Sequence, residues 1–318
     1  MITPKALKAE LPLKKEVKTY QKTVEEILLG KDPRRLLLIG PCSIHNIDSA
    51  YEYALRLKRL ASQVEDRFFI CMRTYFEKAR TALGWKGLLY DPQLDGSHNM
   101  NEGMRLARTL LIALAELDLP AASEFLEPHT PAYLADCISW ASIGARTCQS
   151  PIHRQLASNL DMPIGFKNRC DGNIDMAINA CLTAKEVHHY LGINDDGYLV
   201  EVKSRGNPLP HLVLRGSEAK PNFDYQSIVE ASHRLQVAGL VDAIIVDCSH
   251  DNSQRNYLQQ PEVFLSAMQS PIRGIMVESF LEAGAQSFPI NKRQSITDPC
   301  LDWQATEDLI LKVHQCVS

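Results

Sequence analysis

The fold is indicated most clearly by an apolar run that leads into a loop rich in positive charge. It reads Phe68-Phe69-Ile70-Cys71-Met72, then Arg73-Thr74-Tyr75-Phe76-Glu77-Lys78-Ala79-Arg80-Thr81 and, after two residues, Gly84-Trp85-Lys86-Gly87. A short, continuous apolar run is typical of a strand buried on both faces of a parallel sheet. We therefore expect a buried strand over residues 68–72, with a loop at its carboxyl end.

This loop contains four cations, Arg73, Lys78, Arg80 and Lys86, with aromatic side chains between them. Two like charges about 4 Å apart repel by about 4 kcal/mol at an effective dielectric constant of about 20. A folded loop of this kind is therefore expected to bind an anion, and the planar guanidinium group of arginine fits phosphate and carboxylate. The alternative is a charged loop that contacts only solvent.

The positive charge is local, because the chain of 318 residues has a formal net charge of -4. This balance argues against nucleic acid as the main partner. No run approaches the roughly 20 apolar residues that span a bilayer, and the N-terminus has no apolar signal core, so we expect no membrane association. Nine cysteines without close pairs predict reduced thiols in a cytoplasmic protein.

Apolar runs alternate with amphipathic stretches from residue 36 onward. The expected strands cover residues 36–40, 68–72, 120–125, 143–146, 163–167, 211–216, 243–247 and 274–278. The expected helices cover residues 47–64, 104–117, 133–140, 152–160, 174–190, 225–238, 263–268 and 306–317. This alternation predicts an α/β fold, a (β/α)8 TIM barrel; a doubly wound open sheet is the alternative.

Two segments fall outside the alternation. Residues 1–35, with a helix expected over 13–29, predict a short N-terminal helical extension, which leaves residues 36–318 as a single barrel domain. Between the fifth and sixth strands, Asp196-Gly197 separates two apolar runs. This dipeptide is typical of a tight turn, so we expect an inserted β-hairpin over residues 190–202 on the outside of the barrel.

Ionisable residues follow the expected strands at their carboxyl ends, which is where active sites of such barrels lie. One set is cationic and predicts a site for more than one anionic group: Arg73, Lys78, Arg80, Lys86, Arg146, Lys167 and Arg215. The other set offers a sulfur, a nitrogen and two carboxylates: Cys42, His250, Glu278 and Asp298. This mixture suits Mn²⁺, Fe²⁺, Co²⁺ or Zn²⁺ better than Mg²⁺ or Ca²⁺. The alternatives are a packed thiol, a hydrogen-bonded histidine and carboxylates paired with arginines.

Several motifs resemble those of type I 3-deoxy-D-arabino-heptulosonate 7-phosphate (DAHP) synthases, in order over nearly the whole chain. They are Gly40-Pro41-Cys42-Ser43-Ile44-His45, Arg73-x-Tyr75-Phe76-Glu77-Lys78-x-Arg80-Thr81, Gly84-Trp85-Lys86-Gly87, Ile143-Gly144-Ala145-Arg146-Thr147, Gly165-Phe166-Lys167-Asn168, Leu214-Arg215-Gly216, Asp247-Cys248-Ser249-His250-x-Asn252-Ser253, Val277-Glu278-Ser279 and Ser295-Ile296-Thr297-Asp298. The resemblance implies a transferase that condenses phosphoenolpyruvate with erythrose 4-phosphate and water. The products are DAHP and phosphate, in the first step of the shikimate pathway of aromatic amino acid biosynthesis.

The resemblance also implies roles for single residues and a homodimer or homotetramer. One divalent metal ion (Mn, Fe, Co or Zn) would be held by Cys42, His250, Glu278 and Asp298. Lys78 and His250 would transfer protons, and Glu124 would orient a water molecule. Phosphoenolpyruvate would be bound by Arg73, Lys78, Lys86, Arg146, Lys167 and Arg215, and the phosphate of erythrose 4-phosphate by Arg80 and Thr81, while Ala145 and Asp298 would also contact substrate.

The chain departs from the family pattern at Ala79, Arg169 and Ser217, where proline, glycine and glycine are usual. An arginine in place of a glycine of positive φ would strain the backbone. The three changes leave every expected ligand in place and bear on rate and on the choice of aldose. Two alternatives stay open: a repurposed paralogue that acts on another aldose phosphate, and a non-catalytic barrel that binds a phosphometabolite.

Overall fold

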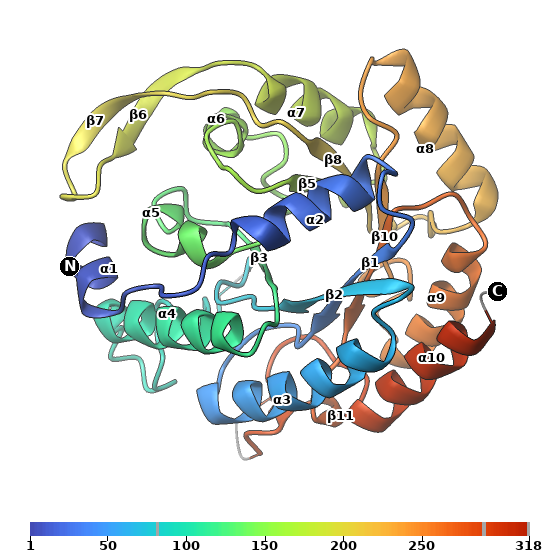
Figure 1. Cartoon of the computed structure of the whole chain (residues 1–318), viewed down its shortest axis with the longest axis horizontal. Coiled ribbons are helices and arrows are strands. Elements are labelled where there is room, and N and C mark those ends of the chain that lie inside the picture. Colours follow the sequence, from blue (N-terminus) through green and yellow to red (C-terminus); the bar gives the residue numbers. More distant parts are fainter. Residues whose placement is uncertain (81–82, 288–290, 317–318) are drawn as a thin grey trace.

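The computed structural model describes residues 1–80, 83–287 and 291–316, and its centre is a closed barrel of parallel strands (Figure 1). The order around the barrel is β1-β10-β9-β8-β5-β4-β3-β2. These strands are β1 (Arg35–Gly40), β2 (Phe68–Arg73), β3 (Ala121–Glu124), β4 (Trp140–Ile143), β5 (Ile164–Lys167), β8 (Pro210–Leu214), β9 (Ile244–Asp247) and β10 (Gly274–Glu278). The predicted TIM barrel is confirmed, and the open-sheet alternative is wrong.

Helices surround the barrel strands, as Figure 1 shows. They are α3 (Ile47–Gln63), α4 (Met100–Glu116), α5 (Pro131–Leu134), α6 (Pro151–Ala157), α7 (Asp175–Lys185), α8 (Tyr225–Val237), α9 (Gln260–Met268) and α10 (Trp303–Cys316), with 3₁₀ turns η1 (Ala135–Cys137) and η2 (Tyr257–Gln259). Side chains fix several starts: Asn46 accepts the N–H of Ser49 at 3.0 Å before α3, and Asp224 that of Ser227 at 2.9 Å before α8. Such caps satisfy donors that a helix leaves free at its first turn.

The alternation of side chains along the strands divides the apolar core into two clusters. In β1, Leu37 and Ile39 belong to the cluster between the strands and the surrounding helices. Leu36 and Leu38 belong to the second cluster, inside the barrel. Successive strand residues point to opposite faces, so a closed barrel with an outer helical layer buries both sets.

The N-terminal segment forms α1 (Pro4–Glu10) and α2 (Lys18–Leu28). Fully buried Val24, Ile27 and Leu28 of α2 pack in the cluster inside the barrel. Figure 1 shows α2 lying across the barrel opening. Because α2 precedes β1, it covers the end where the strands begin, which leaves their carboxyl ends for the site.

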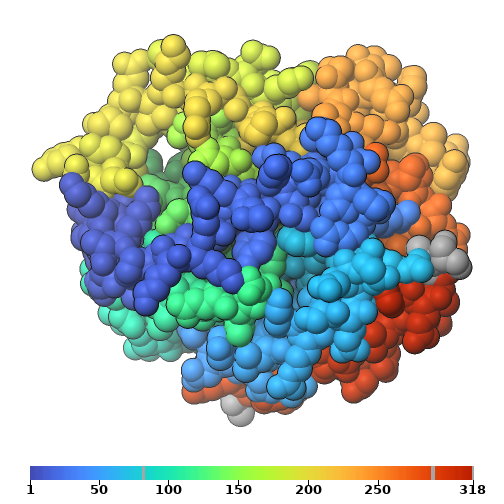
Figure 2. Space-filling view, viewed as in Figure 1, coloured from blue at the N-terminus to red at the C-terminus, as the bar shows by residue number. Residues whose placement is uncertain are grey.

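The predicted hairpin is present and lies outside the barrel. It consists of β6 (His189–Ile193) and β7 (Leu199–Lys203), with Gly197 at φ 82° in the turn. Its tip contacts α1, where the N–H of Lys5 donates to the carbonyl of Asp195 at 2.8 Å (Figures 1 and 2). A further parallel pair, β11 (Glu282–Ala285) and β12 (Gln294–Ser295), follows β10. Within the described ranges, no helix is both long and apolar enough to cross a membrane.

Four of the predicted elements have wrong boundaries. The fourth strand covers Trp140–Ile143 rather than 143–146, because the chain turns after it and Thr147 N–H donates to the carbonyl of Gly144 at 3.0 Å. The helix expected over 133–140 is reduced to α5 and η1. The helix expected over 174–190 ends at Lys185, because residues from 189 onward pair with β7. The helix expected over 13–29 covers only 18–28 and is preceded by α1.

Candidate active site

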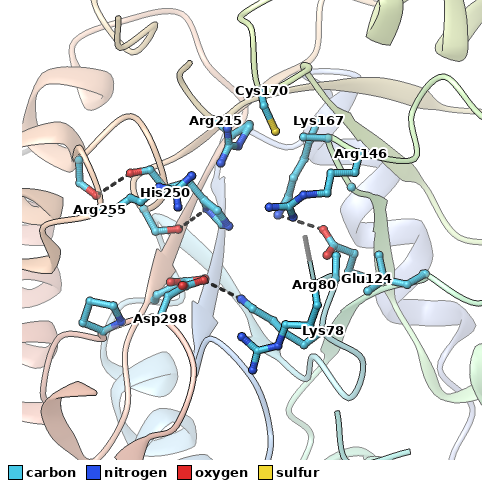
Figure 3. A pocket seen from close by; sticks show the side chains of 18 of the residues that line it. Lys78, Arg80, Glu124, Arg146, Lys167, Cys170, Arg215, His250, Arg255 and Asp298 are labelled. Carbon is cyan, nitrogen blue, oxygen red and sulfur yellow. Dashed lines mark hydrogen bonds and ion pairs between the residues drawn. The ribbon is translucent and has the colours of Figure 1, made fainter. Parts of the chain in front are cut away.

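A pocket lies at the carboxyl ends of the barrel strands, and Figure 3 shows the charged side chains that point into it. Most of the predicted site residues line it together: Lys78, Arg80, Glu124, Ala145, Arg146, Lys167, Arg215, His250, Glu278 and Asp298. Lining residues that the sequence did not single out include Cys170 and Arg255. The predicted residue Thr81 lies outside the described residues.

Three of the four predicted metal ligands form a compact group. One donor atom from each of Cys42, Glu278 and Asp298 lies within 4.8 Å of the others. Glu278 ends β10 and is paired in register with Gly40, two residues before Cys42, so the closure of the barrel brings the first two together. Asp298 arrives from the loop after β12, and its Oδ2 is 3.4 Å from the Sγ of Cys42.

The ammonium group of Lys78 lies against this group, 2.7 Å from both the Sγ of Cys42 and the Oδ2 of Asp298. Burial raises the pKa of the Cys42 thiol to about 12, and the nearby charge of Glu278 adds to this effect. Burial would also raise the pKa of Asp298, but the charge of Lys78 outweighs it and the pKa is lowered. The pocket floor thus places a cation between a sulfur and a carboxylate, and its donor set fits a divalent metal, which also stabilises a thiolate.

His250, the fourth predicted ligand, lines the same pocket but does not belong to the compact group found among the described residues. Its Nδ1 lies 3.0 Å from the Oδ2 of Asp247. Ser249 Oγ donates to Asp247 Oδ1 at 2.6 Å and lies 2.7 Å from the same ring nitrogen. A carboxylate on one nitrogen of a histidine is the usual support for a metal or substrate contact at the other, so Nε2 is the atom that remains for such a contact.

Lys167 is the cation at the centre of the opposite wall. Its Nζ lies 3.1 Å from Glu124 Oε1 and 3.4 Å from Asp247 Oδ2, and all three side chains are nearly or fully buried. Burial would raise the pKa of both carboxyl groups, but the pKa of Glu124 is lowered chiefly by Lys167 and that of Asp247 by His250 and Lys167. Burial would lower the pKa of Lys167, yet these carboxylates raise it. The three groups are therefore charged at neutral pH, and Glu124 is a hydrogen-bond acceptor.

Arg73 lies below the pocket rather than in its wall. Its side chain is buried, with the guanidinium carbon 3.9 Å from the ring centroid of Tyr75 and Nη2 at 3.0 Å from Glu278 Oε1. The structure therefore pairs this predicted substrate ligand with a predicted metal ligand. Its guanidinium group neutralises Glu278 from beneath and stacks on the aromatic ring, as expected for a desolvated arginine.

Lys86 lines a neighbouring cavity, which shares Lys78, Ala79 and Arg80 with the main pocket. A main-chain hydrogen bond joins these two lysines: Lys78 N–H donates to the carbonyl of Lys86 at 2.9 Å. Gly87, at φ 115°, approaches Glu77 so closely that a Cβ atom would lie 2.8 Å from its Cα. A glycine is required at this crossing.

Of the three residues that depart from the family pattern, one lines the pocket and two do not. Ala79 lines the pocket. Arg169 is not among the described residues with positive φ, so the backbone strain expected there is absent; its guanidinium pairs with Asp171 at 2.8 Å. The residue after it, Cys170, enters the pocket, where Figure 3 shows its sulfur. Ser217 donates its hydroxyl to the carbonyl of Lys220 at 2.8 Å.

Sequence reasoning missed Asp247, Asp251 and Arg255. Asp247 ends β9 and stands in one of the motifs quoted above, but the sequence assigned no role to it. Asp251 and Arg255 follow His250 in a turn where His250, Gln254 and Arg255 all have positive φ. Such strained residues gather at functional sites, but no pattern in the sequence reveals the strain.

The comparison with protein families decides the identity of this site. The model of the DAHP synthetase I family matches residues 11–310. The chain belongs to this family. Its fold and the DAHP synthase activity expected from its motifs, the first step of the shikimate pathway, are thereby confirmed.

Relatives of the DAHP synthetase I family match the chain along its full length. It is 42% identical over 330 residues to the Tyr-sensitive phospho-2-dehydro-3-deoxyheptonate aldolase of Escherichia coli K12, covering 99% of this chain and 92% of the relative. It is 44% identical over 331 residues to the Trp-sensitive enzyme of that strain, covering 100% and 95%. The structure of the Francisella tularensis aldolase superposes with a TM-score of 0.97 at 38% identity, covering 100% of this chain and 96% of that one.

Proposed function

We propose that this pocket condenses phosphoenolpyruvate with erythrose 4-phosphate, with one divalent metal ion (Mn, Fe, Co or Zn) at Cys42, Glu278, Asp298 and His250. The observation that carries the proposal is the compact sulfur–carboxylate group at the floor of a pocket lined by Arg80, Arg146, Lys167 and Arg215. The chemistry that a metal supplies in such a site is Lewis-acid polarisation of the aldehyde oxygen.

The cations of the pocket bind the two anionic substrates and reduce the repulsion between them. Arg146, Lys167 and Arg215 bind the phosphate and carboxylate of phosphoenolpyruvate near the backbone of Ala145, and Arg73 supports them by neutralising Glu278. On the other side, Arg80 binds the phosphate of erythrose 4-phosphate. Its Nε donates to the carbonyl of Trp85 at 2.8 Å, which leaves the terminal nitrogens for the ligand. Thr81 is predicted to bind the same phosphate and Lys86 to bind phosphoenolpyruvate, and both assignments stay predictions.

Proton transfer follows from the charges of the pocket residues. Lys78 is an ammonium group, because burial, which lowers its pKa, is outweighed by Cys42 and Asp298, which raise it. It donates a proton to the aldehyde oxygen as the new carbon–carbon bond forms. The carboxylate of Glu124 accepts a hydrogen bond from the water that adds to the second enol carbon. The Nε2 of His250 takes the proton that this water releases while this atom is not bound to the metal. The carbon–oxygen bond to phosphate then breaks, the proton of the new hydroxyl passes to the departing phosphate, and a keto group remains.

The decisive experiment measures phosphate release from phosphoenolpyruvate with erythrose 4-phosphate and with other aldose phosphates, before and after chelation. We expect release with the four-carbon acceptor, loss on chelation and recovery on addition of Mn²⁺, Fe²⁺, Co²⁺ or Zn²⁺. Full activity in thoroughly chelated protein would overturn the metal assignment. Preference for a different aldose would favour the repurposed paralogue, which the departures at Ala79 and Arg169 leave open.

The same proposal includes a cytoplasmic enzyme that assembles as a homodimer or homotetramer, with residues 1–35 as an extension of the barrel domain 36–318. Free, mostly buried cysteines support a reducing compartment. The exposed apolar side chains of the hairpin, Leu191, Tyr198 and Leu199, support contact with another subunit. Sedimentation of the purified chain tests the assembly.

A further inference from the structure

Three charged side chains connect the pocket to solvent beside the carboxyl end of β8. Arg215 follows β8, and its Nη1 donates to the Oδ2 of Asp251. The other carboxylate oxygen of Asp251 accepts a hydrogen bond from the Nε of Arg255 at 3.2 Å. The side chains of Arg215 and Asp251 are only 6% and 9% exposed, whereas that of Arg255 is 64% exposed. Both arginines line the pocket and are labelled in Figure 3, whereas Asp251 is not among the lining residues.

The backbone around Asp251 is fixed to two strand ends. The side chain of the next residue, Asn252, donates to the carbonyls of Leu214 at 3.1 Å and Asp247 at 2.9 Å. Gly216, at φ 78°, comes so close that a Cβ atom there would lie 2.6 Å from the carbonyl carbon of Asp251. These contacts hold the carboxylate next to Arg215, so it stays there when an anion enters the pocket.

We propose that Asp251 is a built-in counterion that weakens the hold of Arg215 on a phosphate group, and so allows inorganic phosphate to leave after each turnover. This inference rests on the proposed function, because Arg215 must bind an anion for its counterion to matter. Lys78 and Lys167 are balanced by carboxylates in the same way. A pocket that must release a multiply charged product gains turnover when its cations are partly neutralised.

The charge of Asp251 can be separated from its role in positioning Arg215. In Asp251→Asn, the amide oxygen still accepts the hydrogen bond of Arg215, but the negative charge is gone. Since one unit charge close to a bound anion is removed, the Kd for inorganic phosphate should fall about tenfold, or by about 1.4 kcal/mol. Asp251→Ser also removes the charge and should shift the Kd in the same direction, should the asparagine variant fail to fold.

The experiment titrates inorganic phosphate into the full, chelated chain in a calorimeter and measures phosphate inhibition of turnover in the metal-loaded enzyme. The matched control is Asp175→Asn, which removes the same charge from a surface pair with Arg234 at 3.1 Å between α7 and α8. We expect tighter phosphate binding, stronger product inhibition and a lower KM for phosphoenolpyruvate in the Asp251 variants, with the control unchanged. If Asp251 only held Arg215 in position, replacing it would raise the KM for phosphoenolpyruvate instead.

Different results would overturn the counterion role of Asp251 and the assignment of Arg215 to the anion site. Unchanged or weaker phosphate binding in both Asp251 variants, or an equal gain in the Asp175 control, would overturn the counterion role. If Arg215→Gln leaves the phosphate affinity of the wild-type pocket unchanged, the assignment of Arg215 to the anion site is wrong, and that part of the proposed function falls with it.

Discussion

Replacing Lys167 with methionine removes the ammonium group that contacts both Glu124 and Asp247 inside the barrel mouth. Breaking a buried ion pair from one side costs about 3 to 5 kcal/mol, because a desolvated charge is left behind. We expect a loss of this size in the free energy of unfolding at about pH 8. Replacing Glu124 by glutamine in the same chain should restore roughly 1 to 3 kcal/mol, because one uncompensated charge is then absent.

The pH dependence of this loss follows from the direction of the pKa shifts. In the wild type, Lys167 outweighs burial and lowers the pKa of Glu124, so the pair contributes stability above about pH 4 that is lost only at lower pH. In Lys167→Met, the charge that opposed the effect of burial on Glu124 is gone, so the pKa of Glu124 rises. Glu124 of the folded protein then takes up a proton as the pH falls. The destabilisation should therefore be smaller at about pH 5.5 than at about pH 8.

Urea unfolding followed by circular dichroism at both pH values measures these differences. The control is Lys5→Met, which breaks an exposed pair with Asp196 and should cost less than about 1 kcal/mol. A Lys167 variant that loses no more than the control, or that loses the same at both pH values, would refute the buried ion network.

Three other substitutions test separate parts of the site. Asp247→Asn removes the carboxylate beside His250 and should weaken metal binding by about 10- to 100-fold in a metal titration; equal affinities would contradict the supporting role. Burial raises the pKa of Glu77 to about 7, so its contribution to stability decreases by roughly 3 kcal/mol as the pH rises from about 4.5 to about 7. In Glu77→Gln, the free energy of unfolding should therefore change less with pH over this range. A pH dependence as steep as that of the wild type would contradict the raised pKa of Glu77. Gly216→Ala should cost about 1 to 3 kcal/mol in urea unfolding, because of its positive φ and its contact with Asp251, and a neutral effect would disprove the close approach.

The barrel could be predicted because its strands are buried on both faces, which makes them continuous apolar runs. The same property makes their boundaries difficult to locate. The residues of β4 and the turn after it, up to Ala145, are all small or apolar, so the pattern alone did not show where pairing stops. The shortened helix α7 has a different cause: residues 189–193 pair with a strand ten positions later, and this tertiary contact overrides the local helical pattern.

The candidate site could be predicted as a set, because the carboxyl ends of parallel strands meet at one rim of a barrel. The orientation of single side chains could not. Arg73 ends β2 as Glu278 ends β10, yet its guanidinium points beneath the pocket toward Tyr75. Asp251 was no more than an unassigned position within a motif, because its meaning comes from the fold of the turn that places it against Arg215.

Helix α2 of the N-terminal extension closes the barrel at the end where the strands begin. Val24, Ile27 and Leu28 fill the mouth opposite the site, and each buried aliphatic side chain contributes about 1.5 to 3 kcal/mol. In a chain that begins at residue 36, the apolar side chains inside the barrel would therefore be exposed to water at the end opposite the active site. The N-terminal segment thus stabilises the barrel from the end opposite the active site.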